Sequence, residues 1–317
     1  NFKTAVKWYT LAAEQGDAYA QYNLALMYND GEGVIVNAET AAKWYTKAAE
    51  QGHPRAQVNL GAMYDNGEGV VENDETAVKW YTLAAEQGDA IAQNNLGAMY
   101  GNGEGVTEND ETAVKWLTLA AEQGDAGAQN YLGTMYDNGQ GVTENDETAV
   151  RWYTLAAEQG NPAAQYNMGM MYQFGEGVIK NDETEAKWFT KAAEQGDAEA
   201  QYELALMYDN GEGVLENDEI AVKWYTLSAE QLNSNAQLAL GRMYEGGEGV
   251  QKNDKTALKW YTKSAEQRLT DAQSALENIN NSNEVILKRG KPFAKAEEQW
   301  LNQATNQGFA GGQRQLI

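Results

Sequence analysis

The chain of 317 residues is strongly acidic, with 47 Asp and Glu residues against 23 Lys and Arg residues. It contains no cysteine, which excludes disulfide bonds and thiol chemistry. No apolar run approaches the roughly 20 residues that a membrane-spanning helix needs. Nucleic acid is disfavoured as a ligand, because phosphate contacts need clustered Lys and Arg side chains.

One sequence unit recurs along almost the whole chain with a period of 36 residues. A fixed period of this size is typical of solenoids, in which each unit packs only against its neighbours. The sequence therefore predicts a single solenoid domain over residues 1–317 rather than separate globular domains. The most regular markers of the period are Trp8, Trp44, Trp80, Trp116, Trp152, Trp188, Trp224 and Trp260.

The chain opens with a partial unit at residues 1–16, and seven full units follow at residues 17–268. Residues 269–317 lose the glycine loop between the helices and are predicted to be a divergent C-terminal repeat and cap, since terminal repeats are commonly atypical. The chain begins at Asn1 without a methionine and opens inside a predicted helix. We therefore expect a soluble fragment or processed product; the sequence leaves its compartment open, and export with removal of a signal is one alternative.

The unit at residues 89–124 shows the predicted elements most clearly. Asp89 is a typical N-cap residue, and residues 90–100 favour a first helix, here called helix A, which ends at the glycines that follow. Asp110 is predicted to cap a second helix, helix B, which runs to Gln123 and is closed by Gly124. The two helices are expected to form a hairpin that buries its apolar face by stacking on neighbouring units.

Two motifs recur in phase in these units: A-x-x-x-L-G-x-M-Y-x-x-G-x-G-V on helix A and its loop, and D-x-x-x-A-x-x-W-Y-x-x-A-A-E-Q-G on helix B. They resemble the Sel-1-like repeat family, a branch of the tetratricopeptide-like solenoids. The resemblance covers residues 1–277 and returns weakly at 293–317. It implies an all-α, right-handed α/α solenoid built from helix-turn-helix repeats.

No pattern in the chain predicts enzyme chemistry. The glycine loops lack the lysine of a phosphate-binding loop, and the acidic clusters lack the spacing of a calcium loop. The single histidine, His53, stands where an N-cap residue is expected. We therefore predict no catalytic residue, cofactor or metal. The tryptophans are predicted to be core residues, with Trp116 buried between helix pairs.

Helix A differs between units at four positions, spaced i, i+3, i+4 and i+7, which place them on one face of the helix. A face that is free to vary is expected to be free of packing against other units. The resemblance implies that helix A lines a concave groove, where Tyr and Asn side chains supply contact area and adaptable hydrogen bonds. The residues predicted to bind a partner are Tyr19, Tyr22, Asn23, Arg55, Asn59, Asn94, Asn95, Asn130, Tyr131, Tyr166, Asn167, Tyr202 and Glu203.

These patterns favour a non-enzymatic scaffold that binds a peptide or protein partner of unknown identity in the groove. Two alternatives remain open at this point. The first is head-to-tail self-association, because residues 251–317 hold ten bases and seven acids, whereas the rest of the chain holds 13 bases and 40 acids. The second is carbohydrate binding by the tyrosines of the groove.

Overall fold

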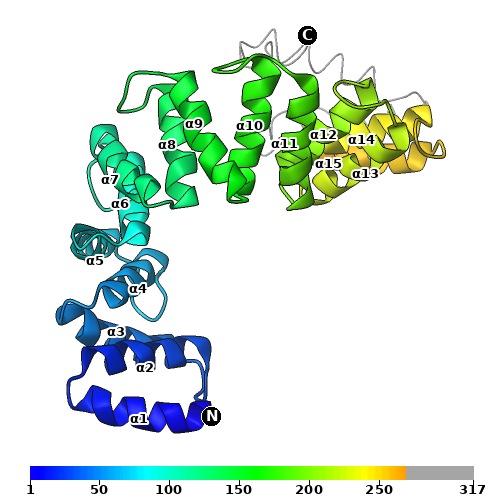
Figure 1. Cartoon of the computed structure of the whole chain (residues 1–317). Helices are drawn as coiled ribbons and strands as arrows, with labels where there is room; N and C mark the ends of the chain where they lie inside the picture. The colour runs from blue at the N-terminus through cyan, green and yellow to red at the C-terminus, as the bar shows by residue number, and fades with distance from the viewer. Residues whose placement is uncertain (269–317) are drawn as a thin grey trace. The chain divides into compact units, whose positions relative to one another are not determined.

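The computed structural model describes residues 1–268, which form fifteen α-helices and no strand (Figure 1). This confirms the predicted all-α repeat architecture. None of the described helices is long and apolar enough to cross a bilayer. The A helices are α2 (Ala18–Asp30), α4 (Pro54–Asn66), α6 (Ala90–Asn102), α8 (Ala126–Asn138), α10 (Pro162–Phe174), α12 (Ala198–Asn210) and α14 (Ser234–Gly246). The B helices are α1 (Phe2–Glu14), α3 (Ala38–Glu50), α5 (Asp74–Glu86), α7 (Asp110–Glu122), α9 (Asp146–Glu158), α11 (Asp182–Glu194), α13 (Asp218–Glu230) and α15 (Asp254–Arg268).

Contacts between residues divide the chain into two compact units, Asn1–Asn181 and Asp182–Ile317. Within each unit, an A helix packs against the B helix that follows it in the same unit, as α6 does against α7, and each B helix packs against the next A helix. The predicted single domain remains a prediction. The predicted C-terminal repeat and cap, with most of the basic segment, lie outside the described residues.

Helix A begins where the sequence predicts. The Asp89 side chain accepts a hydrogen bond of 3.0 Å from the backbone N–H of Ala92, so it is the N-cap of α6. The helix closes at Gly103, whose φ of 73° lies in the left-handed region that glycine adopts without strain. Gly101, the first of the three glycines expected to end the helix, therefore lies inside α6, and the helix ends at the second.

Helix B begins one residue earlier than the sequence suggested. Asn109, with an extended φ of −155°, is the N-cap of α7, and its side chain accepts a hydrogen bond of 2.8 Å from the N–H of Thr112. The prediction that Asp110 caps this helix is therefore wrong. Asp110 and Glu111 instead occupy the first turn, where their negative charges interact favourably with the positive end of the helix dipole.

The core of each helical hairpin is built from alanines around one large side chain of helix B. Leu117 in α7 and Tyr81 in α5 are almost completely buried. Each lies over a glycine of the preceding A helix, and a Cβ added at Gly61 would stand only 2.7 Å from the Tyr81 ring. The small residue thus makes room for the large one, which is how close packing is reached between two short helices.

Most of the tryptophans border this core rather than fill it, whereas Trp260 is buried within it, as predicted. Trp116 is only partly buried, and Trp8 at the start of the chain is 68% exposed. The expectation that Trp116 is buried between helix pairs is therefore wrong, because Leu117, the next residue of the helix, occupies that place. The exposed face of a tryptophan is available to Lys side chains, and the Nζ atom of Lys47 lies 4.2 Å from the ring centre of Trp44.

A glycine in each loop brings successive repeats into direct backbone contact. Gly105, with a φ of 65°, lies against the backbone of Asp74 at the start of α5. No side chain fits between these two segments. This contact explains why the loop retains glycine at this position in every full unit, beyond the need for a turn.

Candidate functional site

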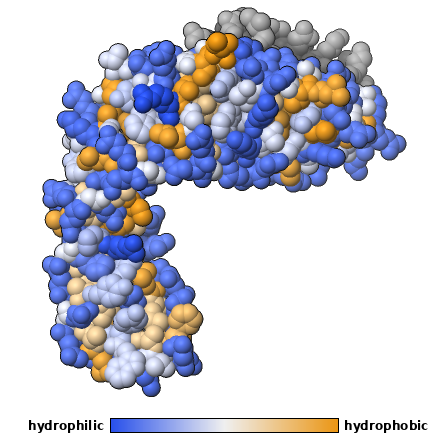
Figure 2. Space-filling model, in the orientation of Figure 1, coloured by the Kyte–Doolittle hydropathy of each residue, from blue (hydrophilic) through white to orange (hydrophobic). Residues whose placement is uncertain are grey.

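The variable face of the A helices is defined by four positions per helix, which in α6 are Ile91, Asn94, Asn95 and Ala98. Ile91 is 56% exposed, and the other three are half-buried. In the view of Figure 2 the surface is mostly hydrophilic, with scattered apolar patches. From α2 to α12 the residues at the first position are all exposed, and they are Tyr19, Arg55, Ile91, Gly127, Ala163 and Glu199.

The second and third positions are more enclosed than expected. The Tyr131 hydroxyl donates to Asn102 Oδ1 at 3.3 Å, and Asn167 Nδ2 donates to Asn130 Oδ1 at 3.0 Å. The expectation that this face is free of packing is thus wrong, because its residues contact those of the neighbouring A helix. The predicted residues found half-buried here are Tyr22, Asn23, Asn59, Asn94, Asn95, Asn130, Tyr131, Tyr166, Asn167, Tyr202 and Glu203.

An aromatic cluster lies where α2 meets α4. The Tyr22 ring stacks on the His53 ring with centroids 4.6 Å apart, and it tilts against Tyr45 at 5.9 Å. His53 is the N-cap of α4, as predicted, and its Nδ1 accepts a hydrogen bond of 3.3 Å from the N–H of Ala56. Burial lowers the pKa of His53, which favours the neutral imidazole that this acceptor role requires.

A hydrogen bond between a tyrosine and a carboxylate connects helix B to the last turn of the preceding A helix. The Tyr153 hydroxyl donates to Asp137 Oδ2 at 3.3 Å and also contacts Thr134, a residue of the variable face. Sequence reasoning missed this pairing, although an acidic residue sixteen positions before the tyrosine signals it. The same bond joins Tyr81 to Asp65 at 3.5 Å, Tyr225 to Asp209 at 3.0 Å and Tyr261 to Glu245 at 2.6 Å.

The unit at residues 89–124 lacks this pair and compensates for it. Leu117 has no hydroxyl, and Gly101 stands at the position of the acid. The Tyr131 side chain from α8 occupies the space, so that a Cβ at Gly101 would lie 2.5 Å from the Tyr131 hydroxyl oxygen. The residues of one repeat are thus matched to those of the next, which accounts for part of the variation on this face.

Two of these carboxylates, Asp137 and Asp65, lie in an acidic, partly desolvated environment. Burial raises the pKa of Asp137, the hydrogen bond from Tyr153 lowers it, and the negative charges of Asp146 and Glu144 raise it further. Burial likewise raises the pKa of Asp65, with Asp74 acting in the same direction. The A helices therefore present negative charge at their C-terminal ends, beside the variable face.

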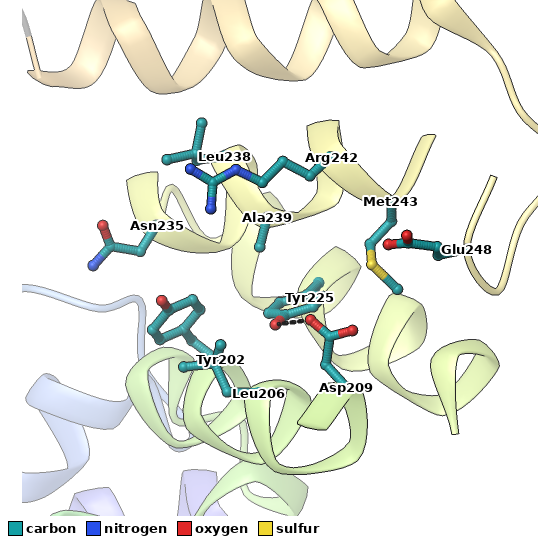
Figure 3. Close-up of a pocket in the computed structure, with 10 residues that line it drawn as sticks. All are labelled: Tyr202, Leu206, Asp209, Tyr225, Asn235, Leu238, Ala239, Arg242, Met243 and Glu248. Atoms are coloured by element: carbon teal, nitrogen blue, oxygen red, sulfur yellow. Dashed lines mark hydrogen bonds between the residues drawn. The ribbon is translucent and has the colours of Figure 1, made fainter. Parts of the chain in front are cut away.

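The second unit contains a cavity of about 180 Å³ between α12, α13 and α14 (Figure 3). Tyr202 and Leu206 of α12 line one side of it, and both occupy variable positions. The opposite side comes from α14, at the positions that the same register gives one repeat further along the chain. The α14 residues that line the cavity at those positions are Asn235, Leu238, Ala239 and Arg242.

The remaining lining of the cavity is polar at one end. The Asp209 carboxylate and the Tyr225 hydroxyl are joined by their hydrogen bond, and Glu248 lies near Met243 (Figure 3). Figure 3 also shows the Arg242 guanidinium directed toward Leu238, away from Asp209. Among residues 1–268 no group of three or more His, Cys, Asp or Glu side chains is arranged to hold a metal ion. The arrangement offers hydrogen bonds, charge and apolar contact to a ligand.

Two solved structures resemble this chain over most of its length. The first is that of c5321, described as a protective antigen present in uropathogenic Escherichia coli strains displaying an SLR fold, with 38% identity and a TM-score of 0.80. The match covers 96% of this chain and 64% of that protein, so this chain spans less than two thirds of its length. The second is a Sel1 repeat protein from Oxalobacter formigenes, with 36% identity, a TM-score of 0.70, and coverage of 86% of this chain and 79% of that one. No curated protein matches the chain.

The sequence model of a family described as Sel1 repeat matches the chain eight times, at residues 1–17, 18–53, 54–89, 90–125, 126–161, 162–197, 198–231 and 234–269. These boundaries follow the helical hairpins of the structure. Proteins of this kind generally mediate protein–protein interaction. Because the matches extend over most of its length, the chain belongs to the Sel1 repeat family.

Proposed function

We propose that this chain is a non-enzymatic scaffold that binds an extended segment of a partner protein along the variable face of its A helices. The observation that carries the proposal is that side chains of this face meet across neighbouring A helices, as Asn167 meets Asn130. In the second unit, side chains at the same positions line a cavity. Within each unit, a surface of this kind suits a chain that runs across several repeats.

The chemistry of the face agrees with a polypeptide ligand. Exposed Tyr19 and Ile91 supply apolar contact area, and half-buried Asn94 carries both hydrogen-bond donors and acceptors. An extended backbone presents N–H and C=O groups at every residue, so amide side chains at regular intervals match it. Sel1 repeat proteins are typically non-enzymatic scaffolds, which is consistent with this role.

The two other functions have less support. Head-to-tail association rests mainly on the basic C-terminal segment, most of which lies outside the described residues. Carbohydrate binding favours a flat aromatic platform, whereas Tyr22 and Tyr202 are tilted against Tyr45 and Tyr225 by 47° and 45°. Polypeptide binding therefore remains the best supported function.

The proposal can be tested by selecting a displayed library of random peptides on the whole chain. The peptides are then measured against a variant with Tyr19→Ser, Arg55→Ser and Ile91→Ser, three exposed changes on consecutive A helices. Because exposed side chains contribute little to folding, the variant should keep its circular dichroism spectrum and its stability. We expect most selected peptides to lose at least about tenfold in affinity, as when contact anchors are removed from an interface.

The matched control changes three exposed leucines of consecutive B helices, Leu83→Ser, Leu119→Ser and Leu155→Ser. Peptide affinity should stay within about twofold of the unmodified chain, because these residues lie outside the proposed surface. The proposal would be overturned if the peptides bind the A-helix variant normally but no longer bind this control. That result would place the binding surface on the B helices.

A further inference from the structure

We infer that the cavity between α12, α13 and α14 binds a cationic side chain, Lys or Arg, of an extended basic polypeptide. This inference rests on the proposed function and specifies the chemistry of the partner. The cavity combines carboxylates at one end with an apolar wall, and both belong to the part of the chain that the structure describes. A long cationic side chain has the same division, with an apolar stem and a charged end.

The charged end of the cavity is formed by Asp209 and Glu248. The hydroxyl of Tyr225 donates to Oδ2 of Asp209 at 3.0 Å and fixes the orientation of this carboxylate. An oriented carboxylate loses less side-chain freedom when it binds a cation, so more of the interaction energy appears as affinity. Cations bound at such a site form charge-assisted hydrogen bonds, which are stronger than those between neutral groups.

The walls fit the stem of the same side chain. Leu206 provides apolar surface and the ring of Tyr202 provides aromatic surface. Met243 and Tyr225 are almost fully buried behind them, and the rings of Tyr202 and Tyr225 have centroids 6.0 Å apart. Aromatic rings also attract a cation that lies over their faces. The volume of about 180 Å³ equals that of roughly six water molecules in the liquid and accommodates one long side chain.

Arg242 also lines the cavity and must be taken into account. Its guanidinium is directed toward Leu238 and away from both carboxylates (Figure 3). The cavity therefore has one cationic and two acidic side chains, an excess of one negative charge. The surrounding protein adds to this excess, since the chain carries a net charge of −24. Complementary charge of this kind steers a basic partner toward the site.

The acidic positions recur at intervals of two repeats, which favours an extended partner over a small cation. Four acidic residues of the second unit, Asp209, Glu216, Asp218 and Glu248, have acidic counterparts 72 and 144 residues earlier. In the first unit, Ala98 and Met170 stand at the position of Arg242, so this position supplies no cation there. The counterparts are Asp65, Glu72, Asp74 and Glu104, and Asp137, Glu144, Asp146 and Glu176.

The test uses the whole chain and three short fluorescent peptides, in which alanine alternates with lysine, glutamine or glutamate. Binding is measured by fluorescence anisotropy at physiological ionic strength, where long-range attraction is screened. We expect the lysine peptide to bind at least about tenfold more tightly than the glutamine peptide, and the glutamate peptide to show no binding. In the variant Asp209→Asn with Glu248→Gln, the lysine peptide should lose about tenfold in affinity.

The matched control carries Glu219→Gln and Glu230→Gln, two exposed acids of α13 that lie outside the cavity. It changes the net charge by the same amount, so the loss of lysine-peptide affinity should stay within about twofold if the cavity is the site. Equal losses in the two variants would show a diffuse charge effect and overturn the inference. If the glutamate peptide binds and its binding disappears in Arg242→Ala, the inference is also wrong, and the cavity binds an acidic partner instead.

The two proposals fail in different ways. If displayed peptides depend on Tyr19, Arg55 and Ile91 but contain no excess of Lys or Arg and tolerate Asp209→Asn with Glu248→Gln, the variable face remains a binding surface and the cationic site is wrong. If no peptide depends on the variable face, both proposals are wrong. Circular dichroism distinguishes either result from a failure to fold, and Asn at position 209 can still accept the hydrogen bond from Tyr225.

Discussion

Gln123 donates a hydrogen bond of 2.7 Å from its Nε2 to Oε1 of Gln93, a buried glutamine of the A helix before it. Gln93 in turn donates to the carbonyl oxygen of Ala85 at 3.1 Å, at the end of the preceding B helix. This one side chain therefore connects α5, α6 and α7. Corresponding glutamines of other described repeats form the same bonds, such as Gln87 with Gln57 at 2.7 Å.

Gln93→Ala should destabilise the chain by about 1–3 kcal/mol, because the buried carbonyl of Ala85 and the amide of Gln123 lose their partner. Gln123→Ala is the comparison, since Gln123 is exposed and its removal leaves the bond to Ala85 in place. We expect a loss of about 0.5–1.5 kcal/mol for that change. Urea denaturation followed by circular dichroism measures both, and equal losses would contradict a central role for Gln93.

Leu117→Ala should cost about 2–5 kcal/mol, as for other fully buried leucines. Trp116→Ala should cost less, about 1–2 kcal/mol, because the tryptophan is only partly buried and loses less apolar contact. The same denaturation experiment ranks the two variants. A larger loss for Trp116 would show that the tryptophan, and not the next residue, forms the centre of the core.

Gly105→Ala and Gly124→Ala separate the effect of a backbone conformation from that of a close contact. Both glycines have a positive φ, 65° and 93°, so each alanine should cost about 1–2 kcal/mol. A Cβ at Gly124 meets no other atom within 4 Å, whereas one at Gly105 collides with the backbone of Asp74. Gly105→Ala should therefore cost a further ~1–3 kcal/mol through overpacking. Indistinguishable midpoints in urea would show that the loop moves to accept the side chain.

Asp137→Asn should make the stability of the chain more sensitive to acid, because the variant lacks a group that stabilises the fold at low pH. Burial raises the pKa of Asp137 in the folded state, while the unfolded chain has a value near 3.9, so the folded state binds more protons over the interval between them. Stability contributed by this group is thus present at low pH and is lost as pH rises through the folded pKa. The Asp137→Asn variant has no titrating group at this position, so it does not lose stability in this way as pH rises.

The stability of the variant relative to the unmodified chain should therefore increase from about pH 3.5 upward and level off above the folded pKa of Asp137. Urea denaturation at a series of pH values measures the difference between the two chains. Asp17→Asn tests a carboxylate of different function, because Asp17 caps α2 by accepting a hydrogen bond of 2.6 Å from Ala20. A difference for Asp137→Asn that stays constant or falls over this range would refute the raised pKa.

Local features of the sequence determined the repeat and most of the helix boundaries. The 36-residue spacing of the tryptophans, Asp89 before an alanine-rich run and the glycines after Tyr100 each reflect interactions within a few residues of one another. Capping and left-handed glycines are local effects, so a single sequence suffices to locate them. The prediction that Asp110 caps α7 was wrong because Asn109, the residue before it, is an equally good cap, and only the backbone conformation distinguishes the two.

The tertiary structure decided which residues, constant or variable between repeats, contact one another. Trp116 and Leu117 are adjacent on one helix, and only the position of α6 buries the second rather than the first. Asp209 meets Tyr225 because two helices cross at that point, and Arg242 shares their cavity through a third. These contacts join residues far apart in the sequence, and helical periodicity specifies a face of one helix but not what lies against it.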